Sequence, residues 1–148
     1  VALAPDGTSA LVLHNKIPGD PLPTDDFQTQ LDKRYGFSLV DLESLFVKLQ
    51  ITLADPGAFA FSPDERMAYL LLADPATGQR DVAVLDLGSF IVATLQVGSH
   101  PVEVGPVAAT NRIYVSQEHP LGRISFIDVA TAQLRTVTGF QLNSQVIE

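Results

Sequence analysis

Three histidines, His14, His100 and His119, are the residues of this chain best suited to metal binding or proton transfer. A neutral imidazole can ligate a transition metal or act as a general base near neutral pH. His100 and His119 both precede proline, a context that favours exposed loops in which a histidine only hydrogen-bonds locally. The spacings H-x-H, H-x-x-E-H and H-E-x-x-H, which would support a metal site, are absent. A weak metal or acid–base site and three structural histidines therefore both stay open.

Other patterns that carry catalysis are missing from the sequence. The chain has no cysteine, which excludes disulfides, thiolate metal sites and cysteine nucleophiles. The nucleophile pattern G-x-S-x-G, a phosphate loop ending in Gly-Lys-Ser/Thr and the dinucleotide pattern G-x-G-x-x-G are absent as well. We therefore predict no catalytic residue and no cofactor.

A long segment between two strand-like stretches, residues 15–35, is the strongest candidate for binding. Prolines exclude regular structure from its first half, and Asp25 and Asp26 can cap a short helix around Phe27–Leu31. Long loops on a rigid scaffold commonly carry binding residues. A solvated loop with one or two anchoring side chains is the alternative. The binding candidates are Leu22, Phe27, Leu31 and Tyr35, together with His100 and His119.

These residues are positioned by a repeat. Asp41, Asp86 and Asp128 occupy the same place in the phrases SLVDLES, AVLDLGS and SFIDVAT, and Tyr69 and Tyr114 match in the same way. A period of about 40–45 residues with β-type patterning indicates propeller blades of four strands each. At a strand end, an aspartate typically accepts N–H groups of the following turn, so we assign these three a structural role.

The repeat predicts an all-β chain of three four-stranded antiparallel blades, a β-propeller that this chain does not close alone. The blades are expected at residues 1–52, 57–98 and 101–139, with residues 15–35 as an insertion between the second and third strands of the first. Residues 140–148 are a tail or the start of a further blade. The innermost strands are nearly continuous apolar runs, which predicts burial on both faces. In the third blade, Asn111 is expected to supply the left-handed residue of the first turn.

The phrases FSPDERMAYLLL, RIYVSQE and ISFIDVATAQL resemble the YVTN-type β-propeller repeat of bacterial and archaeal secreted proteins. The resemblance covers nearly the whole chain apart from the insertion. It implies an extracellular, periplasmic or cell-surface location. The family includes surface-layer proteins, cytochrome-associated domains and lactonase-like enzymes, so the resemblance leaves the activity open.

Composition limits the partners. A formal net charge of -8 argues against nucleic acid and against an anionic membrane surface, and no apolar run approaches the ~20 residues of a membrane span. The only methionine is Met67, so we expect a processed product or an excised part of a longer chain. Three blades leave two open apolar faces, which remaining blades of a longer chain or self-association would cover.

In a propeller, the insertion and the histidine loops share one face. We therefore interpret the chain as a non-catalytic scaffold segment of a secreted or cell-surface bacterial protein, which binds a protein, peptide or glycan through loops on that face. The alternative is part of a lactonase-like or redox-propeller enzyme with a metal or cofactor at the channel mouth. An enzyme needs several polar side chains near the axis, and the inner strands offer only Glu103 as a charged candidate.

Overall fold

The computed structural model of the chain describes residues 1–139, and the tail or further blade expected at 140–148 lies outside them. The described chain forms three four-stranded antiparallel sheets, as the repeat predicted. Sheet 1 comprises β1 (Ala2–Leu3), β2 (Ser9–His14), β3 (Tyr35–Asp41) and β4 (Val47–Thr52); sheet 2 comprises β5 (Pro56–Phe61), β6 (Met67–Asp74), β7 (Gln79–Asp86) and β8 (Val92–Gln96); sheet 3 comprises β9 (Pro101–Val107), β10 (Arg112–Gln117), β11 (Arg123–Asp128) and β12 (Leu134–Thr138).

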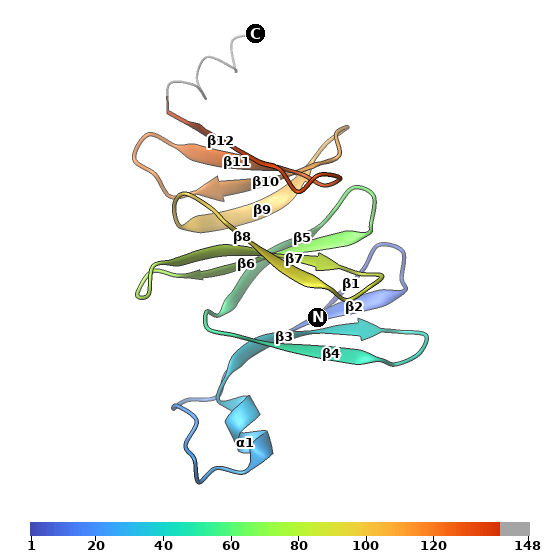
Figure 1. Cartoon of the computed structure of the whole chain (residues 1–148), viewed down its shortest axis with the longest axis vertical. Helices are drawn as coiled ribbons and strands as arrows, with labels where there is room; N and C mark the ends of the chain where they lie inside the picture. The colour runs from blue at the N-terminus through green and yellow to red at the C-terminus, as the bar shows by residue number, and fades with distance from the viewer. Residues whose placement is uncertain (140–148) are drawn as a thin grey trace. The chain divides into compact units, whose positions relative to one another are not determined.

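The chain divides into two compact units, one with sheet 1 up to Pro56 and one with sheets 2 and 3 from Gly57 onward. In every sheet the strands lie in sequence order, an arrangement that needs only short connections. The exception is the connection from β2 to β3, which carries the helix α1 (Phe27–Asp32; Figure 1). Within residues 1–139, no helix is long and apolar enough to cross a membrane.

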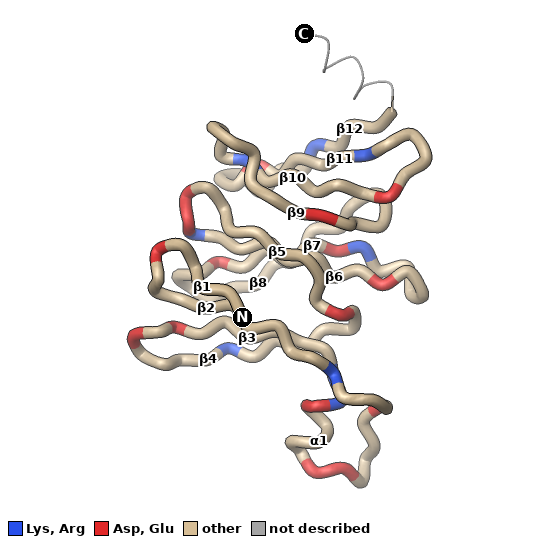
Figure 2. Tube along the Cα trace, turned by 180° about the vertical axis from the view of Figure 1, so that it is seen from behind, with Lys and Arg blue, Asp and Glu red and all other residues tan. Residues whose placement is uncertain are grey.

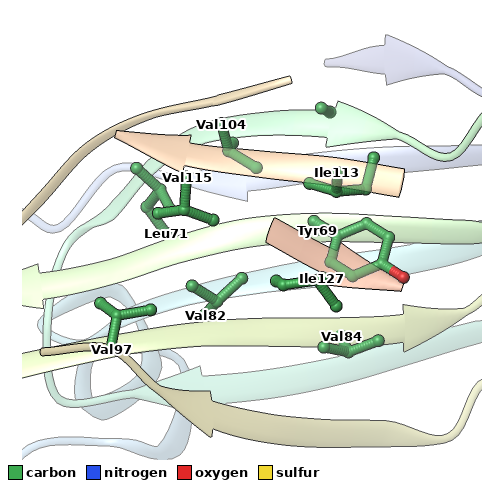
Figure 3. Packing of buried hydrophobic residues seen from close by; sticks show 10 residues of the cluster. Tyr69, Leu71, Val82, Val84, Val97, Val104, Ile113, Val115 and Ile127 are labelled. Atoms are coloured by element: carbon green, nitrogen blue, oxygen red, sulfur yellow. The ribbon is translucent and has the colours of Figure 1, made fainter. Parts of the chain in front are cut away.

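Sheets 2 and 3 pack face to face over one hydrophobic core (Figure 3). Side chains of a strand alternate between its two faces, so Tyr69 and Leu71 of β6 point the same way and meet Ile113 and Val115 of β10. Each fully buried aliphatic or aromatic side chain contributes about 1.5–3 kcal/mol. The buried cluster comprises Ala60, Tyr69, Leu71, Val82, Val84, Val97, Val104, Ile113, Val115 and Ile127.

Burial of the inner strands differs from the prediction. Ala58 in β5 and Val102 in β9 are exposed, so these strands are not buried on both faces. Central strands are more buried: residues 36–39 of β3, 68–72 of β6 and 82–85 of β7 are all buried. A central strand has a hydrogen-bonded neighbour on each side, whereas β5 and β9 are the edges of their sheets. The apolar composition of an edge strand did not reveal this difference.

Asp41, Asp86 and Asp128 each end the third strand of their sheet and shape the turn that follows. The Oδ1 atom of each accepts the backbone N–H of the residue three positions later, at 2.7 Å in sheet 1, 2.8 Å in sheet 2 and 3.0 Å in sheet 3. In sheet 3 the Thr131 hydroxyl also donates, at 2.9 Å. These hydrogen bonds hold the pKa of all three carboxyls below the ordinary value, because they favour the charged form.

The turn between the first and second strands of sheet 3 corrects one expectation. Its left-handed residue is Ala109, with φ 58°, and not Asn111. The backbone N–H and the hydroxyl of Thr110 both donate to the carbonyl of Val107, at 3.2 and 3.0 Å. These bonds close the turn directly after Ala109, so the left-handed residue comes earlier than the amide side chain suggested.

We expect Ala132→Gly to raise the free energy of unfolding by about 0.5–1 kcal/mol. Ala132 has φ 55°, and its counterparts Leu45 and Phe90 in the other sheets are left-handed as well. A left-handed residue with a Cβ atom costs about 1–2 kcal/mol, part of which glycine relieves. Urea denaturation measures the change. Ala130→Gly, two positions earlier in the same turn, is the matched control and should bring no gain; equal effects of the two substitutions would contradict the argument.

Candidate functional site

The connection from β2 to β3 folds into a small lobe, residues 15–34, which we call the insertion lobe. Its helix α1 begins after Asp26, whose Oδ1 accepts the Thr29 N–H at 2.8 Å and whose Oδ2 accepts the Thr29 hydroxyl at 3.1 Å. An aspartate in this position satisfies free N–H groups of the first helical turn. At the base of the lobe, the N–H of Ile17 donates to the carbonyl of Asp32 at 2.8 Å. The lobe is therefore closed at both its helix start and its base.

Asp25 ties the two halves of the insertion lobe together. Its Oδ2 accepts the backbone N–H of Leu22 and the Nζ of Lys33, both at 2.8 Å. The side chains of this ion pair are only 14% and 16% exposed, so water screens the pair less than it screens a surface pair. The hydrogen bond from Lys33 holds the pKa of Asp25 below its ordinary value. The sequence suggested both aspartates as helix caps, but only Asp26 caps α1 and Asp25 anchors the proline-rich half.

The four apolar candidates of the insertion divide into two pairs. Phe27 is 77% exposed and Leu22 is 53% exposed, although both belong to a lobe that hydrogen bonds hold in place. Leu31 and Tyr35 are half-buried. The Nζ of Lys16 lies 5.3 Å from the centre of the Tyr35 ring, a cation–π distance. The first pair is free to meet a partner, whereas the second pair fixes the lobe.

A small cavity of about 110 Å³ lies between the insertion lobe and sheet 1. Leu31 of α1 and Leu49 and Ile51 of β4 supply its apolar wall. The volume suffices for a few water molecules or one small side chain. The polar and remaining lining residues are His14, Asn15, Gln28, Asp32, Arg34, Tyr35 and Gly36.

The polar groups of this cavity already have partners in part. The Nε2 of His14 and the Oγ of Ser38 lie 2.8 Å apart in a hydrogen bond, and Ser38 is only 6% exposed. The Nε2 of Gln28 donates to Oδ1 of Asp32 at 2.7 Å. Arg34 forms no ion pair with another residue of the described range 1–139. The cavity can therefore hold a small polar group beside an apolar wall.

His100 and His119 lie at the loop end of sheet 3, in the second unit. The N–H of Glu118 donates to the carbonyl of His100 at 2.8 Å, which brings the two loops together. The Nδ1 of His119 accepts the N–H of Leu121 at 3.2 Å, a local hydrogen bond within its own loop. Across residues 1–139, no group of three histidine, aspartate or glutamate side chains is placed to hold a metal ion. His14 belongs to the first unit, where it lines the cavity beside the lobe.

A second cavity, of about 320 Å³, opens on the face of sheet 3 that points away from sheet 2. Phe126 and Val137 form its floor, and Arg112 and Arg135 stand beside it. Neither arginine forms an ion pair within residues 1–139. Sequence reasoning missed this site, because only the strand register places two arginines 23 positions apart around one phenylalanine.

Two solved structures share the architecture described above. One is a hydrazine synthase of Kuenenia stuttgartiensis, with a TM-score of 0.60 and 17% identity over 94% of this chain. The other is TolB of Acinetobacter baumannii, with a TM-score of 0.51 and 16% identity over 93% of this chain. Both are propeller-type proteins. The chain has the fold of a partial, unclosed β-propeller.

The likeness has a defined extent. This chain covers 35% of the hydrazine synthase chain and 31% of the TolB chain, so it spans about a third of either. Three sheets are also fewer than the four to eight blades of a closed propeller. No protein-family model matches the chain, and no curated protein matches it. At this identity the likeness establishes the fold alone.

Proposed function

We propose that the chain is a non-catalytic β-propeller scaffold of a secreted or cell-surface bacterial protein, of the YVTN-type repeat class, which binds a protein, peptide or glycan through its insertion lobe. The observation that carries the proposal is an ordered lobe with exposed apolar side chains. Phe27 and Leu22 are 77% and 53% exposed, and the Asp25–Lys33 pair and the Asp26 cap hold the backbone beneath them.

The order of the lobe is what makes it suitable for binding. A loop that is already ordered loses less conformational entropy when it meets a partner, so more of the contact energy appears as affinity. Exposed aromatic residues on such a support are typical of interface hot spots. A partial propeller also needs other blades, from a longer chain or from further copies, to cover its open sheet faces.

We expect the double variant Leu22→Ala and Phe27→Ala to weaken binding about tenfold or more, without unfolding the chain. A peptide display library and a glycan array, both screened with the unaltered chain, supply the ligands, and titration calorimetry measures their dissociation constants. Ile91→Ala is the matched control, because Ile91 is 63% exposed on a turn of sheet 2. Unchanged affinity in the double variant would remove the lobe from the binding surface.

A further inference from the structure

Sheets 2 and 3 show how two sheets of this repeat dock. Tyr69 and Val84 project from adjacent positions of β6 and β7 on the face of sheet 2 that meets sheet 3. Ile113 and Ile127, an adjacent pair of β10 and β11, project from the face of sheet 3 that receives them. Figure 3 shows these side chains converging from the two sheets. Two sheets of this repeat therefore dock through a face like that of Tyr69 and Val84 on one sheet and a face like that of Ile113 and Ile127 on the other.

The face of sheet 3 that points away from sheet 2 corresponds to the face of sheet 2 that carries Tyr69 and Val84, and we call it the trailing face. Tyr114 and Phe126 are paired across β10 and β11 as Tyr69 and Val84 are paired across β6 and β7. Unlike Tyr69, which is 1% exposed, Tyr114 and Phe126 are only half-buried. The apolar residues of the trailing face are the half-buried Val107, Tyr114, Ile124 and Phe126 and the buried Val137.

One face of sheet 1 corresponds to the face of sheet 3 that carries Ile113 and Ile127, and we call it the leading face. Val40 precedes Asp41 as Ile127 precedes Asp128, and it pairs with Ala10 as Ile127 pairs with Ile113. This face continues onto β4, where Leu49 and Ile51 also line the cavity beside the insertion lobe and are still partly exposed. Its exposed residues, with their exposed fractions, are Leu42 at 38%, Val47 at 53%, Leu49 at 43% and Ile51 at 41%.

The trailing face of sheet 3 carries charged side chains where the docked face of sheet 2 has apolar ones. Arg112 and Arg135 of the trailing face occupy the places that Met67 and Ala93 occupy in sheet 2. Met67 packs on the buried core, whereas both arginines are exposed beside the 320 Å³ cavity. Asp128 lines the same cavity and lies directly across from Arg112, whereas Arg135 lies opposite Phe126. The guanidinium of Arg135 is therefore suited to a carboxylate brought by the sheet that covers this face.

A carboxylate stands at the corresponding place of sheet 1. Glu43, which is exposed, follows Leu42 in the turn after β3, where sheet 3 has Ala130 after Val129. Val129 packs against the core between sheets 2 and 3, so this turn lies at the edge of a docked pair of sheets. The trailing face thus carries Arg112 and Arg135 beside the carboxylates of Asp128 and Glu103, and Figure 2 shows both acidic and basic positions along the strands of sheet 3. The leading face has Glu43 at its matching edge.

We propose that the trailing face of one copy docks head to tail on the leading face of a second copy, with Arg112 and Arg135 against Glu43. The packing repeats that of sheets 2 and 3, and the inference rests on the partial propeller of the proposed function by naming what covers its faces. A head-to-tail contact uses two different patches, so copies add one after another, into a ring where the rotation between them closes and into a filament where it does not. The 320 Å³ cavity is then filled by the turn of the second copy that carries Leu42 and Glu43.

Charge reversal tests the docking. The double variant Arg112→Glu and Arg135→Glu, and separately the variant Glu43→Lys, should each weaken self-association about tenfold or more, because each places like charges in contact. An equimolar mixture of the two variants should associate again, since a head-to-tail contact is restored between unlike copies. Sedimentation velocity and light scattering over a range of concentrations measure the assembly. Arg66→Glu and Glu65→Lys, in a turn of sheet 2, are matched controls and should associate like the unaltered chain.

Three results would overturn the proposal. The unaltered chain could stay a monomer at all concentrations, which would mean that further blades of a longer chain, and not a second copy, cover the faces. The variants could associate as strongly as the unaltered chain. The mixture could fail to associate although each variant alone is impaired. Ligand binding by the insertion lobe, measured in the Arg112→Glu and Arg135→Glu variant, tests the proposed function independently, because that variant leaves the lobe intact.

Discussion

Ile113→Ala is expected to lower the free energy of unfolding of the unit formed by sheets 2 and 3 by about 2–5 kcal/mol. Ile113 is fully buried in the cluster between these sheets. Truncation removes three side-chain carbons from the core and leaves a cavity that the surrounding sheets close only in part, and both effects destabilise. The loss is a large share of the 5–15 kcal/mol by which a domain is typically stable.

Native-state amide exchange of β6 and β10 measures this loss, because it reports on the second unit without the first. The slowest amides of both strands should exchange faster by the same free energy. Val102→Ala is the matched control: Val102 lies on β9 of the same sheet, is 49% exposed, and should change the exchange free energy by less than about 0.5 kcal/mol. A cost below about 1 kcal/mol for Ile113→Ala would show that the core does not hold the two sheets together.

The fold could be predicted from the sequence because the same strand and turn pattern recurs three times. The matched positions of Asp41, Asp86 and Asp128 fix the end of the third strand in every sheet, and the four-strand pattern follows from turns at similar distances. Which strands are buried could not be predicted in the same way. An edge strand and a central strand can have equally apolar composition, and only hydrogen-bond pairing separates β5 from β6.

Contacts between residues close in the sequence could be predicted in the insertion lobe, whereas contacts between distant residues could not. Asp26 lies directly before α1, and its side chain reaches an N–H three positions away, so a capping pattern revealed it. The ion pair of Asp25 with Lys33 joins residues eight positions apart, a spacing that no local pattern marks. The pairing of Phe126 with Arg135 likewise depends on the register of β11 and β12, which a one-residue shift would abolish.

Because of Tyr69, the stability of the second unit is expected to change with pH in the alkaline range. Burial, with a smaller effect of the Asp64 and Asp128 carboxylates, raises the pKa of Tyr69 to about 12 from the model-compound value of 10.0. Below pH 10 the phenol is protonated in both the folded and the unfolded chain, so its contribution is fully present. Between pH 10 and about 12 the unfolded chain releases this proton and the folded chain keeps it. Because the unfolded state then binds fewer protons, the free energy of unfolding falls as the pH rises.

We expect this fall to reach about 2–3 kcal/mol by pH 12, at about 1.4 kcal/mol per pH unit, and Tyr69→Phe to remove it. Amide exchange of β6 or urea denaturation between pH 9 and pH 12 follows the stability. Lysines also titrate in this range, so the quantity to compare is the difference between the unaltered chain and the variant at each pH. Tyr35→Phe, in the first unit, should leave the fall unchanged. Parallel pH curves for the unaltered chain and Tyr69→Phe would show that the buried phenol titrates at its ordinary pKa, and that the core between sheets 2 and 3 admits solvent at Tyr69.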